Sequence, residues 1–194
     1  MDIRPLRDLA ALSTGMTPSV LGKSRLGQEI PLITIKDINH SLTPIDELSR
    51  VATAPAAVPR FRVHPGDVVV TMRGTVVRAA VVESSHAGAI AGANLAIVRV
   101  RSELAPALLA AFLREPGTQK ALLRSTAGAV TPGFTIKALG DLPVRVPSRE
   151  RQKILVAYLA AADAHREALM RALELRQLAS ESLIAIELSA SAAS

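Results

Sequence analysis

Cations and hydrogen-bonding side chains beside runs of β-branched residues are the groups in this sequence best suited to binding chemistry. Val68–Thr71 and Val76–Val82 predict the two strands of a β-hairpin, because Val and Thr fit a pleated sheet and a Gly separates the runs. We interpret the connection, which carries Arg73 and Thr75, as a tight turn, and Arg78 follows it. A guanidinium and a hydroxyl on a rigid hairpin can bind a phosphate or a base edge. The alternative is an ordinary solvent-exposed turn.

A second set of polar side chains lies at the end of Ile30–Ile38, whose apolar residues alternate as in a strand. Lys36, Asn39 and His40 occur at the exit of this segment, from which they can reach DNA. Asn can pair with adenine, whereas Lys mostly anchors phosphate. A solvated loop is the alternative interpretation of these three positions.

Three further polar residues lie before and after the hairpin. Arg60 ends a long surface loop predicted over residues 41–60 and Arg62 follows it, and we expect both to contact the DNA backbone. Asn94 opens a strand predicted over Asn94–Arg101. Its amide can either read a base or close the turn before the strand.

Catalytic and metal-binding chemistry has little support in the sequence. There is no Cys, and the four His residues lie far apart without the spacing of metal ligands. The sequence has no Gly-rich cofactor loop, no HExxH, no GxSxG and no Asn/Asp-Pro-Pro-aromatic methyltransferase motif. We therefore expect a protein that is not an enzyme and needs no cofactor or metal. The lack of a targeting segment and of a long apolar run predicts a cytoplasmic protein without membrane contact.

Short elements must position these side chains. Of the 194 residues 49% are apolar but only 2% are aromatic, so we expect an aliphatic core. Helices are predicted over residues 5–13, 106–114 and 118–126, a loop over 127–140 and a last strand over 142–146. Together with the hairpin, these elements predict an α+β fold: a β-rich domain with short helices, followed by a long helix.

The long helix is predicted over residues 149–188, which contain no Gly and no Pro. Ser148 is its expected N-cap. A helix of this length extends about 60 Å, too long for one face of a small globule. Its apolar residues follow a heptad, which predicts a coiled-coil seam with a partner chain; an amphipathic helix lying on its own domain is the alternative. The seam positions are Leu155, Tyr158, Ala162, His165, Leu169, Ala172, Arg176, Ala179, Leu183 and Ile186.

The excess of positive over negative charge lies in the part of the chain before this helix. Residues 1–148 contain 17 Lys and Arg against 11 Asp and Glu, whereas residues 149–194 contain 6 of each. A basic domain ahead of a neutral helix is the distribution expected if the domain meets a polyanion and the helix meets protein.

Several short motifs occur in a fixed order along the chain. They are Leu6-Arg7-Asp8-Leu9 with Thr14-Gly15; Ile30–Ile33 with Lys36-Asp37-Ile38; Gly66–Val70 with Arg73-Gly74-Thr75; Asn94-Leu95; Leu139–Val146 with Pro147; and Gln152, Ile154, Leu159 and Asp163. This ordered set resembles the target-recognition domain and spacer helix of specificity (S) subunits of type I DNA restriction-modification systems. The chain departs from the family pattern where Pro147 stands alone and Arg151-Gln152 replaces Glu-Gln. It also has one recognition domain where a full S subunit has two.

The resemblance implies a non-catalytic reader of double-stranded DNA. The expected division is a recognition domain over residues 1–147, a spacer and dimerisation helix over 148–188 and a disordered tail over 189–194. The chain would act as a half-subunit that forms a homodimer through the helix. It would recruit the modification methyltransferase subunit, and the restriction subunit as a further partner, to a bipartite site. The alternatives are a coiled-coil protein-interaction adaptor and a DNA-reading subunit of another phage-defence system.

Overall fold

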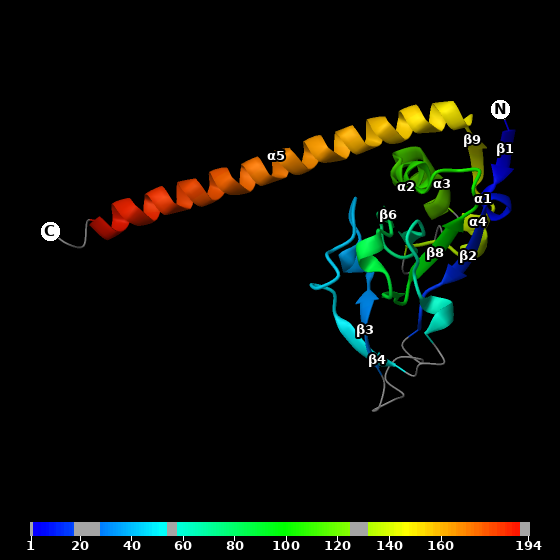
Figure 1. The fold of residues 1–194 in the computed structure, drawn as a ribbon, viewed down its shortest axis with the longest axis horizontal. Helices are drawn as coiled ribbons and strands as arrows, with labels where there is room; N and C mark the ends of the chain where they lie inside the picture. Colours follow the sequence, from blue (N-terminus) through cyan, green and yellow to red (C-terminus); the bar gives the residue numbers. More distant parts are fainter. Residues whose placement is uncertain (1, 18–27, 54–57, 125–131, 191–194) are drawn as a thin grey trace. The chain divides into compact units, whose positions relative to one another are not determined.

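The chain forms two units, Met1–Gln152 and Lys153–Ser194, and all described strands belong to the first (Figure 1). The computed structural model describes residues 2–17, 28–53, 58–124 and 132–190. The first unit holds the strands and short helices, and the second continues a long helix. The predicted α+β class is confirmed.

A four-stranded antiparallel sheet forms the centre of the first unit. Its strands are β2 (Ala10–Thr14), β8 (Leu95–Val100), β5 (Val68–Thr71) and β6 (Ala79–Val81), paired in that order. Successive side chains of a strand point to opposite faces of a sheet. All residues of β5 are buried, which shows that both faces of the sheet are covered.

Two smaller sheets complete the β structure. One has the order β4-β3-β7, in which β3 (Gln28–Ile33) pairs antiparallel with β4 (Arg50–Thr53) and parallel with β7 (Ile90–Ala91). The other pairs β1 (Asp2–Pro5) with β9 (Pro143–Val146), so the two ends of the first unit lie together.

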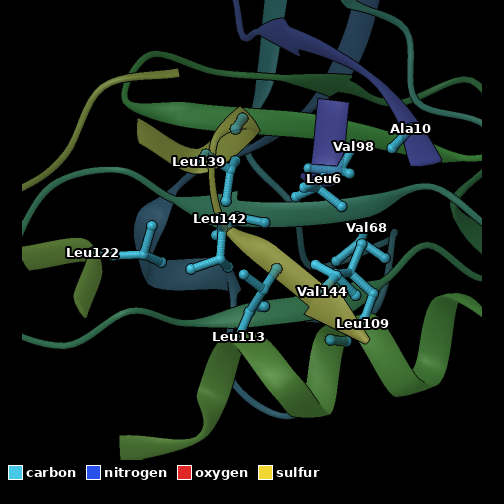
Figure 2. Packing of buried hydrophobic residues seen from close by; sticks show 14 of the residues in the cluster. Leu6, Ala10, Val68, Val98, Leu109, Leu113, Leu122, Leu139, Leu142 and Val144 are labelled. Atoms are coloured by element: carbon cyan, nitrogen blue, oxygen red, sulfur yellow. The ribbon is translucent and has the colours of Figure 1, made fainter. Parts of the chain in front are cut away.

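Aliphatic side chains fill the core on both faces of the four-stranded sheet. On one face Val68 and Val98 belong to the same buried cluster as Leu109 and Leu113 of α2 (Pro106–Arg114) (Figure 2). The same cluster takes residues from α1 (Leu6–Leu9), α3 (Pro116–Arg124) and α4 (Ile136–Gly140). On the other face Val69 and Ile97 pack with residues of the segment 33–48. Each fully buried Val or Leu stabilises the fold by about 1.5–3 kcal/mol.

The long helix α5 spans Arg149–Ala190. Ser148 caps it, because the backbone N–H of Arg151 donates to the Ser148 Oγ over 3.3 Å. The predicted helix and its N-cap are therefore confirmed. Among the described helices, none combines the length and apolar character needed to cross a membrane.

Two elements near the N-terminus differ from those predicted by the local sequence pattern. The predicted helix over residues 5–13 is wrong: only Leu6–Leu9 is helical, and Ala10–Thr14 forms β2 against β8. Strand pairing satisfies the backbone there, so the Leu periodicity does not decide the structure. The predicted strand over 30–38 is also shifted, because β3 ends at Ile33 and a short 3-10 helix follows at Ile35–Asp37.

Two predicted loops contain regular structure. Residues 41–60 include β4, and Leu42, Leu48 and Val58 are buried there, so the segment is not simply a surface loop. The interval 127–140 ends in α4, where the Thr135 side chain accepts from the N–H of Ala138; residues 127–131 lie outside the described ones. Strands β8 and β9 and helix α2 are confirmed close to their predicted bounds.

Candidate nucleic-acid interface

Arg73, Thr75 and Arg78 lie on an exposed loop rather than on a tight turn. Strand β5 ends at Thr71 and β6 begins at Ala79, so the connection, here called the 72–78 loop, is longer than predicted. Its two ends are joined by reciprocal bonds. Thr71 N donates to Arg78 O, and Arg78 N donates to the buried Thr71 Oγ1, both over 2.9 Å.

Residues 132–134 hold the first half of the 72–78 loop. Gly74 N donates to Pro132 O over 3.0 Å, and Phe134 N donates to Met72 O over 3.1 Å. Gly133 forms an isolated bridge with Arg73, and a Cβ at Gly133 would lie 2.5 Å from Met72 O. Such a close backbone approach requires glycine. The backbone that carries Arg73 is therefore fixed, while its side chain is exposed.

Gln119 of α3 holds the second half of the loop. The backbone N–H of buried Val77 donates to Gln119 Oε1 over 3.0 Å. The Gln119 side-chain amide in turn donates to Arg114 O over 2.8 Å. One amide thus fastens the loop to the junction of α2 and α3. Sequence analysis missed Gln119, because nothing local marks a contact that spans 42 positions.

Glu115 stabilises the same junction at the start of α3. Its carboxylate accepts from Gly117 N over 2.8 Å and from Thr118 N over 2.7 Å. These backbone hydrogen bonds lower the pKa of Glu115. A carboxylate at a helix start satisfies N–H groups that have no partner within the helix, so Glu115 fixes the helix that carries Gln119.

Arg114 connects the start of β6, directly after the 72–78 loop, with the segment that carries Lys36, Asn39 and His40. Its Nη1 donates to Ala79 O over 2.8 Å and to His40 O over 3.4 Å. His40 therefore lies beside the start of β6, whose first residue, Ala79, directly follows Arg78. Lys36 and Asn39 are exposed on the same 36–40 segment.

Buried polar groups fold the 36–40 segment. Asp37, 5% exposed, accepts from Thr34 N over 2.8 Å and from Thr34 Oγ1 over 2.6 Å, which holds the 3-10 turn. His86 is also buried, and its Nε2 lies 2.9 Å from Thr43 O. The Asp37 carboxylate thus holds the turn at the start of the segment, and His86 holds Thr43, three residues beyond its end.

The remaining candidates are placed apart from this arrangement or have another role. Arg60 stacks over the Phe61 ring, 4.4 Å from its centroid, and lines a hollow with residues 12–14 and Ile136. The backbone of Arg62 forms an isolated β-bridge with that of Ile90. No contact places either arginine beside the 72–78 loop among the described residues. Asn94 has a left-handed φ of 64°, which favours the turn-closing interpretation.

Asp67 and Arg99 form an ion pair at the base of the hairpin. Arg99 Nε lies 2.8 Å from one carboxylate oxygen and Nη2 lies 2.7 Å from the other, and Asp67 is only 2% exposed. The hydrogen bond to Asp67 raises the pKa of Arg99. Because this guanidinium is held by a buried acid, Arg99 serves the fold rather than an anionic ligand. No group of acidic or His side chains among the described residues could hold a metal ion.

The helix α5 carries apolar side chains with large exposed fractions. Of the seam positions, Tyr158, Leu169, Leu183 and Ile186 are more than half exposed, and Leu155 is half-buried. The other seam positions, Ala162, His165, Ala172, Arg176 and Ala179, lie on the same helix. Exposed Leu residues also lie off the predicted seam, so the apolar surface is wider than a strict heptad stripe.

Comparisons with solved structures identify the architecture. No protein-family model matches the sequence, and a search of curated proteins found no significant match. The structure is similar to a chain from a study of complex assembly and conformational transition of the type I R-M system, with 23% identity and a TM-score of 0.62. It is also similar to the HsdS subunit of Thermoanaerobacter tengcongensis (22% identity, TM-score 0.59) and to the type I restriction-modification S subunit of M. genitalium (14% identity, TM-score 0.55).

The extent of these matches defines what is shared. They cover 88%, 88% and 90% of this chain, but only 40%, 39% and 42% of the solved ones. The chain therefore spans about two fifths of the length of its structural neighbours. The resemblance found in the sequence is confirmed at the level of the fold: this chain has the architecture of a type I restriction-modification S subunit over that shared part.

Proposed function

We propose that this chain is a DNA sequence-recognition subunit of a type I restriction-modification system. The observation that carries the proposal is the S-subunit fold combined with a loop whose backbone is fixed and whose Arg73, Thr75 and Arg78 side chains are exposed. A fixed loop presents hydrogen-bonding groups to DNA without losing much conformational entropy on binding.

The 72–78 loop and the 36–40 segment both contact DNA in this proposal. Arg73 is the best candidate for a bidentate bond to guanine, and Asn39 for an adenine. Lys36 anchors phosphate, while Thr75, Arg78 and His40 contact base edges or the adjoining backbone. Arg60 and Arg62 supply more distant backbone contacts. The chain performs no chemistry itself, and methylation or cleavage comes from partner subunits.

The long helix provides the contacts with protein. Exposed Leu and Ile side chains in such number indicate a surface that is covered by another chain. A second copy of the chain, packed along the heptad seam, would supply a second recognition domain. Two domains related by a two-fold axis would read a palindromic site split by a spacer. The modification methyltransferase subunit, with the restriction subunit as a further partner, would dock on the same assembly.

Mapping of methylated adenines in host DNA tests the proposal. The expected result is a split palindromic motif that disappears when this gene is deleted and returns with the wild-type copy. In the same assay Arg73→Ala should relax the motif at one position, since a bidentate base contact contributes about 1–3 kcal/mol. An asymmetric motif would replace the homodimer with a second, different reader. Unchanged methylation on deletion would refute the proposed role.

A further inference from the structure

A surface hollow of about 590 Å³ lies beside the 72–78 loop. One of its walls belongs to α3, which carries none of the DNA-binding residues predicted from the sequence. The loop contributes Thr75, and α3 contributes the opposite side. The lining residues are Thr75, Pro116, Gln119, Lys120, Leu123 and Arg124.

Two cations give the α3 wall its charge. Lys120 and Arg124 are exposed and lie four positions apart, so they project from the same side of the helix. Within the described part of the chain neither forms an ion pair with a carboxylate. Glu115, the nearest acid in sequence, already accepts two backbone N–H groups. Like charges at this spacing destabilise a helix, and an anion bound in the hollow would remove that cost.

A hydrogen bond joins the two walls of the hollow. Gln119, itself part of the lining, bonds to the backbone of Val77 in the loop. Thr75 lies two residues before that bond, so its position is tied to the helix that carries Lys120 and Arg124. A hydroxyl-bearing residue and two cationic residues thus line one open hollow, and their donor groups suit phosphate oxygens.

We propose that Lys120 and Arg124 of α3 bind DNA phosphates adjoining the bases that the 72–78 loop reads. This inference rests on the proposed function and extends it, because it assigns α3 as a backbone-anchoring element. Anchors on α3 set the register of the loop on the duplex without reading sequence themselves.

The test compares DNA binding by the wild-type full chain with DNA binding by the double variant that carries both Lys120→Gln and Arg124→Gln. Gln keeps helix propensity and removes charge. The probe is a fluorescein-labelled duplex that contains the methylation motif, titrated at several salt concentrations. Each phosphate contact contributes a slope of about 0.9 in log affinity against log salt, which is roughly 8-fold in affinity at about 0.1 M salt. The double variant should therefore bind roughly 60-fold more weakly, with a slope reduced by about 2.

Site preference separates this role from base reading. The double variant should keep the wild-type ratio of affinities for the motif and for a mismatched duplex, because phosphate contacts carry no sequence information. Lys137→Gln is the matched control: it removes a cation that pairs with Asp141 and does not line the hollow, so its salt slope should stay at the wild-type value. An unchanged slope in the double variant would overturn the inference while leaving the proposed function intact. If the wild-type chain bound no duplex at any salt concentration, the proposed function and this inference would both fall.

Discussion

Replacement of Gln119 by Ala should loosen the 72–78 loop while leaving the side chains of Arg73, Thr75 and Arg78 themselves unchanged. The substitution removes the acceptor of Val77 N–H and the donor to Arg114 O. Val77 is 2% exposed, so water cannot readily replace the lost acceptor. A buried donor left unpaired costs about 1–3 kcal/mol, and the free energy of unfolding should fall by that amount.

The same change should reduce sequence discrimination. A guanine contact from Arg73 would contribute about 1–3 kcal/mol of preference for the correct base. Part of this preference is lost whenever the loop leaves its reading conformation. A loss of about 1.4 kcal/mol of preference corresponds to a tenfold fall in the ratio of specific to mismatched affinity. The slope of affinity against salt should stay unchanged, because phosphate-binding cations remain in place.

Competition binding and chemical unfolding measure these two effects separately. Gln177→Ala serves as the control, because the Gln177 amide bonds only to Glu181 along α5 among the described contacts and lies outside the first unit. It should alter neither the affinity ratio nor the salt slope. A Gln119→Ala protein that lost stability but kept the wild-type affinity ratio would refute the idea that Gln119 positions the reading loop.

Three further substitutions test the framework around the site. Gln152→Ala should lower the free energy of unfolding by about 1–3 kcal/mol, measured by denaturant, because the buried amide accepts from Ala105 N and donates to two backbone carbonyls. Glu115→Gln should be less stable than wild type at neutral pH. Since the folded pKa of Glu115 is lowered, that difference is full above the ordinary carboxyl pKa and should shrink as pH falls through the folded value. Leu169→Asp should abolish helix pairing in sedimentation while the first unit keeps its unfolding transition; a variant that stayed dimeric would show that the seam is not the interface.

Local pattern predicted the elements whose structure is decided locally. The Val-rich β5, the strand β8, helix α2 and the long α5 follow directly from residue type and period. The helix predicted over residues 5–13 is wrong because the Leu spacing there suits a helix, whereas pairing with β8 makes the second half of the segment a strand. Such pairing joins residues 82 to 90 positions apart, and a window of local sequence carries no trace of it.

Residue chemistry identified the candidate reading side chains but not what holds them. Arg73 and Arg78 stand out in the sequence because cations beside a Val-rich hairpin are conspicuous. Gln119 and Arg114 do not stand out, since a polar residue on a short helix is ordinary until the fold brings it to the loop. Lys120 and Arg124 were missed for the same reason: their spacing marks one side of α3, and only the structure shows that this side lines a hollow beside Thr75.

The exposed surface of α5 is consistent with more than one protein partner. Ile186, a seam position, and Leu188, which is not one, are both more than half exposed, at 61% and 71%. Two residues along a helix correspond to a rotation of about 200°, so these side chains lie on nearly opposite faces. A single partner helix buries one stripe. The second face would then be covered by a different chain, as expected if one helix pairs recognition domains and also docks a methyltransferase subunit. In that arrangement Leu188→Asp should weaken subunit docking and leave helix pairing intact, whereas Leu169→Asp should do the reverse.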